Sequence, residues 1–309
     1  MSLHESPSMP APRILAFGDN VVDCYRDERL MFPGGNCVNH AVFARRAGAE
    51  TAYVGAVCDD AAGRLIRDAL AAEGVDVTGL RCEAGQTAYC VIETVEGERQ
   101  FVGANLGPSI IAPLAADLAR MARVDAVHTG RSSHVDAWLP HFAALTRVSY
   151  DLATVRDPSR IAQVAPHCFL LGFSGGDLPQ TAALSLAEDA RRDGACWALV
   201  TRGGEGALLA GPEGIFEAPV RPVAAVDTLG AGDTFIAHVL VGLLRDMPAD
   251  TVLAHAAQAA ADTCLMRGAF GHGAQMDVDL SAMMSLDEIY RTTRPAATPR
   301  AVSALNTLG

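Results

Sequence analysis

Short apolar runs alternate with longer amphipathic segments along most of this chain, and no other feature limits the fold as strongly. The runs predicted to be strands cover residues 13–18, 51–57, 124–128, 148–151, 168–172 and 196–201. The segments predicted to be helices include residues 36–48, 61–73, 231–245 and 250–267. Strands that alternate with helices in this way build a mostly parallel sheet with helices on both faces. The chain is therefore predicted to be an α/β protein.

Residues 86–103 break this alternation. Two strand-like runs, TAYCVIETV and RQFVG, meet at Glu96 and Gly97, which form a hairpin signal. A hairpin inserted early in an α/β chain is a candidate for a lid or a dimer contact. A second, shorter hairpin is predicted over Gly211 and Pro212.

A glycine-rich turn precedes the predicted helix 231–245 and carries the strongest chemical signal. The segment is Asp227-Thr-Leu-Gly-Ala-Gly-Asp233-Thr-Phe. The first turn of such a helix presents free N–H groups, here those of Gly230, Ala231 and Gly232, and the helix dipole favours an anion beside them. A carboxylate next to an anion site suits phosphoryl transfer to an alcohol, because it can accept the hydroxyl proton. Taken alone, the same residues would also suit a tight turn and a helix cap.

A second motif, Gly34-Gly35-Asn36-Cys-Val-Asn39, opens the predicted helix 36–48. Asn36 is the predicted N-cap, and the two asparagines lie three residues apart, on one face of the helix. Amide side chains both donate and accept hydrogen bonds, so the pair suits vicinal sugar hydroxyls. Read alone, the motif is also an ordinary turn and cap.

Polar residues follow the first predicted strand in the segment Gly18-Asp19-Asn20-Val-Val-Asp23. Their position is the carboxyl end of a strand, the edge at which α/β sheets place their ligands. Asp19, Asn20 and Asp23 are therefore candidates for the same site as the asparagine pair.

Lysine is absent, since all 24 basic residues are arginines. This excludes Schiff-base chemistry and mechanisms that use a phosphate-binding lysine. Against 36 acidic residues the net charge is −12, which argues against a nucleic-acid partner and against an anionic membrane surface. A small-molecule partner fits this charge better.

Eight scattered cysteines form no C-x-x-C pair, and no secretory leader is recognisable. We interpret them as reduced thiols of a cytoplasmic protein. The most apolar stretch, residues 220–244, contains two aspartates and a histidine, so no membrane-spanning segment is predicted.

Four segments together resemble the ribokinase or PfkB family of carbohydrate kinases, over about residues 13–273. The segments are GDNVVD, GGNCVN, AGAETAYVGAVCDDAAGRLIRDALAAEGVD and VDTLGAGDTF. Within the family the chain is most similar to bacterial fructoselysine 6-kinase, through GDN-x-VD, GGN-x-VN-x-AV and the closing GAFG.

The resemblance implies a fold and a domain plan. The fold would be a three-layer α/β/α sandwich with a small β-sheet lid built from residues near 23–32 and 82–104. The kinase domain would span residues 13–275, and residues 1–12 and 276–309 would be flexible or partly helical termini. Since the family often dimerises through such lids, a homodimer through the lid is expected.

The resemblance also implies roles for the motif residues. Asp233 would be the base that deprotonates a sugar hydroxyl, and Gly230, Ala231 and Gly232 would form the anion hole for the γ-phosphate. The positions that match sugar contacts are Asp23, Gly35, Asn36 and Asn39, with Asp19 and Asn20 as helpers. The positions that match ATP contacts are Thr201, Gly203, Gly206, Thr228, Ala260, Thr263 and Gly268.

The family further implies Mg²⁺ with ATP and a monovalent cation such as K⁺ at Asp227. Its usual N-x-x-E, tied to Mg²⁺, is replaced here by Ser174-Gly-Gly-Asp177, which keeps oxygen ligands at the same spacing. Asp177 is therefore the candidate that holds Mg²⁺ through water. Arg202 stands where the family more often has an apolar residue; we interpret it as a surface arginine, with a phosphate contact as the alternative.

Two further polar residues are interpreted as structural. Asp151 matches a family position near the floor of the site, but the Asn and Arg that usually follow it are Ala153 and Val155 here. His128 ends a predicted strand within reach of a ligand, yet a core or surface histidine is the better interpretation, since no histidine has metal-ligand spacing.

The sequence thus predicts an enzyme that uses ATP to phosphorylate a hydroxyl group of a sugar or of a sugar-amine conjugate, the 6-hydroxyl in a fructoselysine-like case. A fructosamine substrate would also predict an acidic lid contact to its ammonium group, for which Glu93, Glu96 and Glu98 are available. Two alternatives stay open. One is a kinase of the same fold for ribose, fructose or a nucleoside, and the other is a sugar-binding or regulatory protein with weak catalysis.

Overall fold

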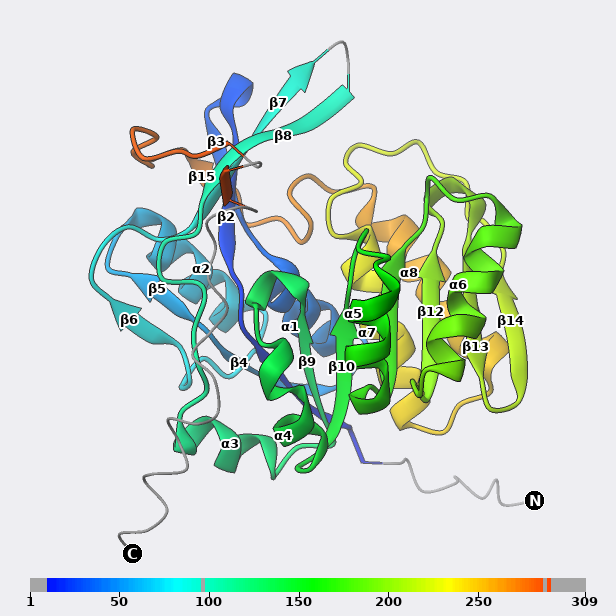
Figure 1. Cartoon of the computed structure of the whole chain (residues 1–309). Coiled ribbons are helices and arrows are strands. Elements are labelled where there is room, and N and C mark those ends of the chain that lie inside the picture. The colour runs from blue at the N-terminus through cyan, green and yellow to red at the C-terminus, as the bar shows by residue number, and fades with distance from the viewer. Residues whose placement is uncertain (1–9, 96–97, 286–287, 290–309) are drawn as a thin grey trace, which may run out of the picture.

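The computed structural model describes residues 10–95, 98–285 and 288–289, and an eight-stranded sheet forms its centre (Figure 1). In spatial order the strands are β14 (Gly214–Ala218), β13 (Ala207–Gly211), β12 (Trp197–Thr201), β11 (Leu170–Ser174), β10 (Arg147–Asp151), β9 (Ala126–Gly130), β1 (Arg13–Phe17) and β4 (Glu50–Val54). The six strands from β12 to β4 run parallel, and the predicted hairpin β13–β14 adds two antiparallel strands at one edge. The prediction of a mostly parallel sheet is confirmed.

Helices cover the sheet in two layers, as expected for strands whose side chains point alternately to opposite faces. On β1, Ile14 and Ala16 pack into one core, whereas Leu15 and Phe17 pack into the other. The first core contains side chains of α1 (Asn36–Arg46), α2 (Ala61–Ala72), α7 (Ala231–Leu244) and α8 (Ala249–Thr263). The second contains side chains of α3 (Ala115–Met121), α4 (Leu139–Ala143), α5 (Pro158–Val164) and α6 (Gln180–Arg192). The molecule is a three-layer α/β/α sandwich.

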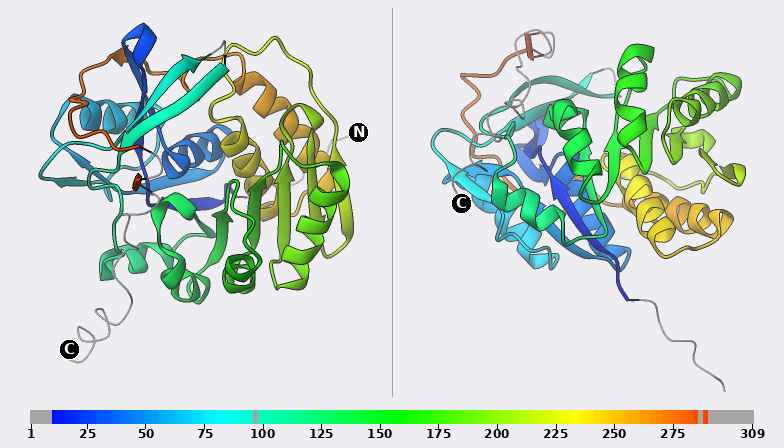
Figure 2. Two further views of the ribbon diagram at one scale, coloured as in Figure 1. Left: turned by 45° about the horizontal axis from the view of Figure 1, so that its top comes forward. Right: turned by 60° about the horizontal axis from the view of Figure 1, so that its bottom comes forward.

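A second sheet forms the lid, which projects beyond the three layers (Figures 1 and 2). Its strands, in spatial order, are β15 (Ala274–Gln275), β3 (Leu30–Gly34), β2 (Val21–Tyr25), β7 (Tyr89–Val95) and β8 (Glu98–Asn105). Because β2 follows β1 after a three-residue turn, the lid stands at the carboxyl end of the central strands. The turn between β7 and β8 at Glu96 and Gly97 lies outside the described residues.

Two predicted elements differ clearly from the structure. The predicted strand 51–57 is divided at Gly55 into β4 and β5 (Ala56–Cys58), and β5 pairs with β6 (Arg81–Glu83) outside the lid. The division follows from Tyr53, whose hydroxyl binds the Gly18 carbonyl at 2.8 Å and would lie 2.0 Å from a Cβ at residue 55. The helix predicted over 250–267 ends at Thr263.

Part of the predicted flexible C-terminal segment is fixed against the lid. Met284 forms an antiparallel bridge with Ala104 of β8, through backbone hydrogen bonds of 2.9 and 3.0 Å. The segment before it, from residue 276, is therefore part of the fold, and beyond Met284 the structure describes only Ser285, Glu288 and Ile289. Within the described part of the chain, no helix is long and apolar enough to cross a membrane.

Candidate active site

Asp233, in the first turn of α7, lies directly against the two asparagines of α1. Asn36 donates from Nδ2 to Asp233 Oδ1 at 2.9 Å, and Asn39 donates from Nδ2 to Asp233 Oδ2 at 2.7 Å. The structure thus brings together the two motifs that the sequence singled out, although they are nearly 200 residues apart. Both donors of Asn36 Nδ2 and one donor of Asn39 Nδ2 are engaged by carboxylates, and the contact of the pair with vicinal sugar hydroxyls stays a prediction.

The start of α1 also corrects the predicted cap. The helix begins at Asn36 and its N-cap is Gly35, whose φ of 100° suits glycine. A Cβ on Gly35 would lie 2.7 Å from the Asn20 Cα, so only glycine lets the helix start this close to the turn after β1. Asn36, released from capping, turns its side chain toward carboxylates.

Asn36 contacts two further aspartates. Its Nδ2 also donates to Asp151 Oδ2 at 2.9 Å, and its backbone N–H donates to Asp19 Oδ2 at 3.0 Å. Asp151 ends β10, and Asp19 follows β1 and accepts a hydrogen bond from Ser133. Asp151 is therefore part of the site, where the sequence analysis had interpreted it as structural.

These carboxylates alter one another's ionisation. Burial raises the pKa of Asp233 to about 8; the charges of Asp151 and Asp19 add to this, and the hydrogen bonds from Asn39 and Asn36 oppose it. Burial likewise raises the pKa of Asp151 to about 6. A base with a pKa close to the working pH is well matched to taking a proton from an alcohol.

The other predicted sugar contacts have different environments. Asp23 on β2 is buried, and burial together with the charge of Asp227 raises its pKa to about 7. Asn20 is fully buried, and its amide donates to the Tyr53 hydroxyl and to the Ala56 carbonyl, both at 2.9 Å. Asn20 therefore supports the turn after β1, and its role as a helper in sugar binding stays a prediction.

The first turn of α7 offers fewer free amides than predicted. Gly230 is the N-cap with φ 78°, and a Cβ there would lie 2.6 Å from the Ala269 Cβ. The Ala231 N–H donates to the Thr228 carbonyl at 3.3 Å, so it is not a free donor. The described residues supply no acceptor for the Gly232 N–H, and nothing lies within 4 Å of a Cβ built at Gly232. Gly232, beside Asp233, thus has an open amide, and the Gly230 N–H likewise has no acceptor among the described residues.

A groove of about 770 Å³ begins at this open amide. Five of the predicted ATP contacts line it, namely Thr201, Gly203, Gly206, Thr228 and Ala260, together with Ala231 and Gly232. Thr263 lies outside the lining, because its hydroxyl is buried against that of Thr234 at 2.9 Å. Gly268 also lies outside it: its N–H donates to Asp227, and it packs against the ring of Phe32.

The candidate metal ligands are engaged by protein groups. Arg156 donates to both oxygens of Asp177 at 2.8 and 2.6 Å, and Asp177 does not line the groove. Asp227 is buried, and its carboxylate accepts hydrogen bonds from Tyr25, Leu229 and Gly268.

Among the described residues no group of three or more histidine, cysteine or acidic side chains is arranged to hold a metal ion. A Mg²⁺ ion held through water and substrate phosphates needs no such group. The predicted Mg²⁺ contact of Asp177 and the predicted monovalent-cation contact of Asp227 therefore stay predictions, and no chemical step is assigned to a protein-bound metal.

Arg202 is not the surface residue that the sequence analysis expected. It is 7% exposed, pairs with Glu205, and leaves its Nε buried without a partner among the described residues. It does not line the groove, so the phosphate contact is not supported either.

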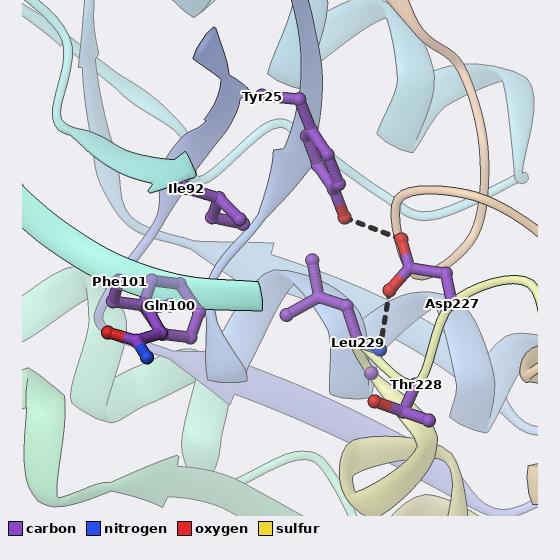
Figure 3. Close-up of a pocket in the computed structure, with 8 residues that line it drawn as sticks. Tyr25, Ile92, Gln100, Phe101, Asp227, Thr228 and Leu229 are labelled. Carbon is purple, nitrogen blue, oxygen red and sulfur yellow. Dashed lines mark hydrogen bonds between the residues drawn. The ribbon is translucent and has the colours of Figure 1, made fainter. Parts of the chain in front are cut away.

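A smaller cavity of about 280 Å³ lies between the lid and the loop that precedes α7 (Figure 3). Ile92 and Phe101 of the lid border it, and the Tyr25 hydroxyl points to Asp227, with 2.5 Å between Tyr25 Oη and Asp227 Oδ2. Of the described residues that line the cavity, only Asp227 is charged. The cavity thus combines an apolar wall with negative charge.

A phosphotransferase that acts on an alcohol needs a base and a donor for the phosphoryl charge. Here an aspartate of raised pKa lies beside an open amide at the start of a helix, at the end of a large groove. The chain belongs to the pfkB family of carbohydrate kinases, whose sequence model matches residues 14–140 and 170–271. It is therefore a carbohydrate kinase, as predicted.

Curated relatives and solved structures agree with this family. The chain is 35% identical to the fructosamine kinase of Bacillus subtilis (strain 168), over 84% of this chain and 94% of the relative. It is 30% identical to the fructoselysine 6-kinase of Escherichia coli (strain K12), over 83% of this chain and 99% of the relative. The Arabidopsis thaliana ribokinase complexed with ribose and ATP superposes with a TM-score of 0.73 at 20% identity, over 85% of this chain and 95% of that one.

Proposed function

We propose that the protein transfers the γ-phosphoryl group of ATP to a primary hydroxyl group of a sugar-amine conjugate of the fructosamine or fructoselysine type, the 6-hydroxyl. The observation that carries the reaction is the contact of Asp233 with Asn36 and Asn39, next to the open amide of Gly232. The acceptor class is supported by the likeness to a fructosamine kinase and to fructoselysine 6-kinases.

The reaction follows from the positions of these groups. The nucleotide occupies the groove between Thr201 and Ala260, with its terminal phosphate at the start of α7, where the Gly232 N–H and the helix dipole stabilise the charge on the phosphoryl group. The acceptor hydroxyl lies between Asp233 and that phosphate. Asp233 Oδ takes the hydroxyl proton while the oxygen attacks phosphorus in line, and ADP leaves along the groove.

Asn36 and Asn39 act on the base. Their two hydrogen bonds fix the orientation of the Asp233 carboxylate and counter part of the rise of its pKa. Orienting a catalytic group in advance lowers the entropic cost of reaching the transition state.

The small cavity supports an acceptor with a cationic substituent. Its negative charge comes from Asp227, and no basic side chain stands among the described residues that line it. Glu93, one of the acidic lid residues expected to contact an ammonium group, instead pairs with Arg26. The side chains of Glu96 and Glu98 lie outside the described part of the structure. We therefore assign the ammonium contact to the cavity at Asp227.

The proposal also covers the oligomeric state and the cellular compartment. The protein forms a homodimer through the lid, supported by Phe101 of β8, a large apolar side chain that is 47% exposed. It works in the cytoplasm, supported by eight cysteines that are all free thiols.

A substrate panel with coupled detection of ADP tests the acceptor class. The panel contains fructoselysine, a second fructosamine, fructose, ribose and a nucleoside, each with ATP and Mg²⁺. The highest kcat/KM is expected for the two fructosamines. Faster turnover of a neutral sugar or a nucleoside would contradict the acceptor class but keep the kinase. Sugar-induced thermal stabilisation without ADP release would instead identify a binding protein.

A further inference from the structure

His128 lies in the middle of β9, fully buried, directly beneath the site. Its Nε2 is 3.0 Å from Asn36 Oδ1, and its Nδ1 is 2.9 Å from the Ser149 hydroxyl on the neighbouring strand β10. The ring of His40, from α1, stacks on it with 3.5 Å between the ring centroids. Neither the family resemblance nor the sequence pattern gave this histidine a role.

The hydrogen bonds fix which atoms carry protons. Asn36 donates from Nδ2 to both Asp151 and Asp233, so its Oδ1 is the acceptor that faces His128. His128 must then carry its proton on Nε2, and Nδ1 must accept from the Ser149 hydroxyl. The ring is neutral, because burial and the neighbouring His40 hold its pKa well below the usual range.

We propose that His128 is a positioning residue for the kinase reaction, which locks the amide of Asn36 so that its NH₂ group faces the carboxylates of Asp233 and Asp151. The proposal rests on the assignment of Asp233 as the base. Ser149 completes the chain by holding the Nδ1 edge of the ring at 2.9 Å. A chain of hydrogen bonds thus runs from the sheet to the reacting carboxylate and fixes its orientation. Its members are Ser149, His128, Asn36 and Asp233.

The amide needs this lock because its two ends are not equivalent here. If the Asn36 amide turned over, its oxygen would face two carboxylates, which is repulsive, and the His128 ring would have to change its tautomer to accept from the NH₂ group. Without His128, the buried Oδ1 of Asn36 would lose its donor, and other rotamers would compete. Asp233 would then keep only the hydrogen bond from Asn39 reliably.

Several charged or titratable groups face this chain. Asp19 and Asp151 face Asp233, Arg131 acts on Asp151, and His238 of α7 lies beyond His40. None of these takes part in the hydrogen bonds of the His128 ring. Loss of the Asn36 hydrogen bond removes one of the two contacts that lower the pKa of Asp233, so the pKa moves upward.

The test compares His128→Leu with His40→Leu. Both rings are fully buried and stacked together, but neither ring nitrogen of His40 has a hydrogen-bond partner among the described residues. The readouts are the pKa of Asp233, measured by ¹³C NMR without substrate and assigned with Asp233→Asn, and the steady-state kinetics. Thermal unfolding of each variant controls for folding.

His128→Leu is expected to raise the pKa of Asp233 and to lower kcat by about fivefold to tenfold, the order expected for one hydrogen bond, with KM for ATP unchanged. His40→Leu is expected to keep the wild-type pKa of Asp233, and His128→Gln, which keeps a donor, to restore part of kcat. If His128→Leu does not fold, Ser149→Ala must raise the same pKa.

An unchanged pKa of Asp233 in His128→Leu, or an equal shift in His40→Leu, would overturn the proposal. Because this pKa is measured without turnover, its result does not depend on whether Asp233 is the base of a kinase reaction. Full activity of Asp233→Asn would overturn that assignment instead.

Discussion

Asp233 holds its proton to a higher pH than an ordinary aspartate, because burial and the nearby charges of Asp151 and Asp19 disfavour the ionised form. Two asparagine amides work in the opposite direction. The balance leaves a carboxylate that is basic enough to accept a proton from an alcohol and still ionised in part near neutrality.

This balance predicts the pH dependence of activity. Since the pKa of Asp233 is about 8, kcat/KM for the sugar should fall about tenfold for each pH unit below that value. Asp151→Asn removes a neighbouring negative charge, so the fall should begin at a lower pH. Steady-state kinetics from pH 5.5 to 9.5 measure both profiles, and a flat wild-type profile between pH 6 and 8 would refute the prediction.

The same pKa predicts how stability depends on pH. The folded state keeps the Asp233 proton up to about pH 8, whereas the unfolded chain loses it near the ordinary aspartate pKa of 3.8. Between these values the unfolded state binds fewer protons, so the free energy of unfolding contributed by this group falls as pH rises.

The wild-type protein should therefore lose free energy of unfolding between pH 5 and pH 8, and Asp233→Asn should lose less. The stability of Asp233→Asn relative to wild type should thus be higher at pH 8 than at pH 5. Urea denaturation at both pH values gives the difference; equal pH slopes for the two proteins would contradict it.

At the residue scale a motif predicts best where it fixes both the identity and the position of a residue. The two motifs singled out Asp233, Asn36 and Asn39, because their neighbours define helix starts, and the structure brings these three side chains into contact. The hydrogen-bond partners of individual side chains could not be predicted from the sequence. Nothing local shows that Arg156 occupies Asp177, or that Asn20 faces Tyr53, since these contacts depend on how distant strands pack.

Helix α7 is the element on which the site depends, and two of its glycines have different tasks. Gly230 needs its positive φ and has no room for a Cβ, whereas Gly232 is helical and open. The first glycine serves the fold, and the second leaves open space beside Asp233, where we propose that the phosphate binds.

A pair of alanine substitutions separates these tasks. Gly230→Ala should destabilise the protein by about 1–2 kcal/mol or more, because a left-handed alanine is strained and meets Ala269. Gly232→Ala should leave stability equal or higher by up to about 1 kcal/mol, yet lower kcat/KM for ATP at least about tenfold, because its methyl group fills the phosphate space. Urea denaturation and the ADP assay measure both effects. Wild-type kinetics in Gly232→Ala would show that no phosphate binds there.

Elements with a clear hydrophobic period were predicted to within a few residues, because the spacing of apolar residues shows which face of a helix or strand is buried. The exceptions have tertiary causes. The strand over 51–57 divides because the Tyr53 hydroxyl occupies the space beside Gly55, and Met284 joins the lid by backbone pairing that needs no side-chain pattern.

The whole molecule combines a rigid sandwich with a lid that rises from the end of β1 (Figure 1). The proposed dimer would cover Phe101, a large apolar side chain that is 47% exposed on the lid. Light scattering coupled to gel filtration should give a mass close to twice the 32.3 kDa of one chain. Phe101→Ser should shift the protein toward the monomer at the same concentration. A wild-type monomer up to about 100 μM, a hundredfold above a micromolar affinity, would contradict the dimer.

The central claim is that Asp233 activates the acceptor hydroxyl beside the terminal phosphate of ATP. The direct measurement is kcat of Asp233→Asn in the coupled ADP assay, with sugar affinity from calorimetry on the same preparation. The account predicts that kcat falls by about 10²–10⁴ while the sugar still binds with nearly wild-type affinity. Turnover within a few fold of wild type would show that this carboxylate is not the base.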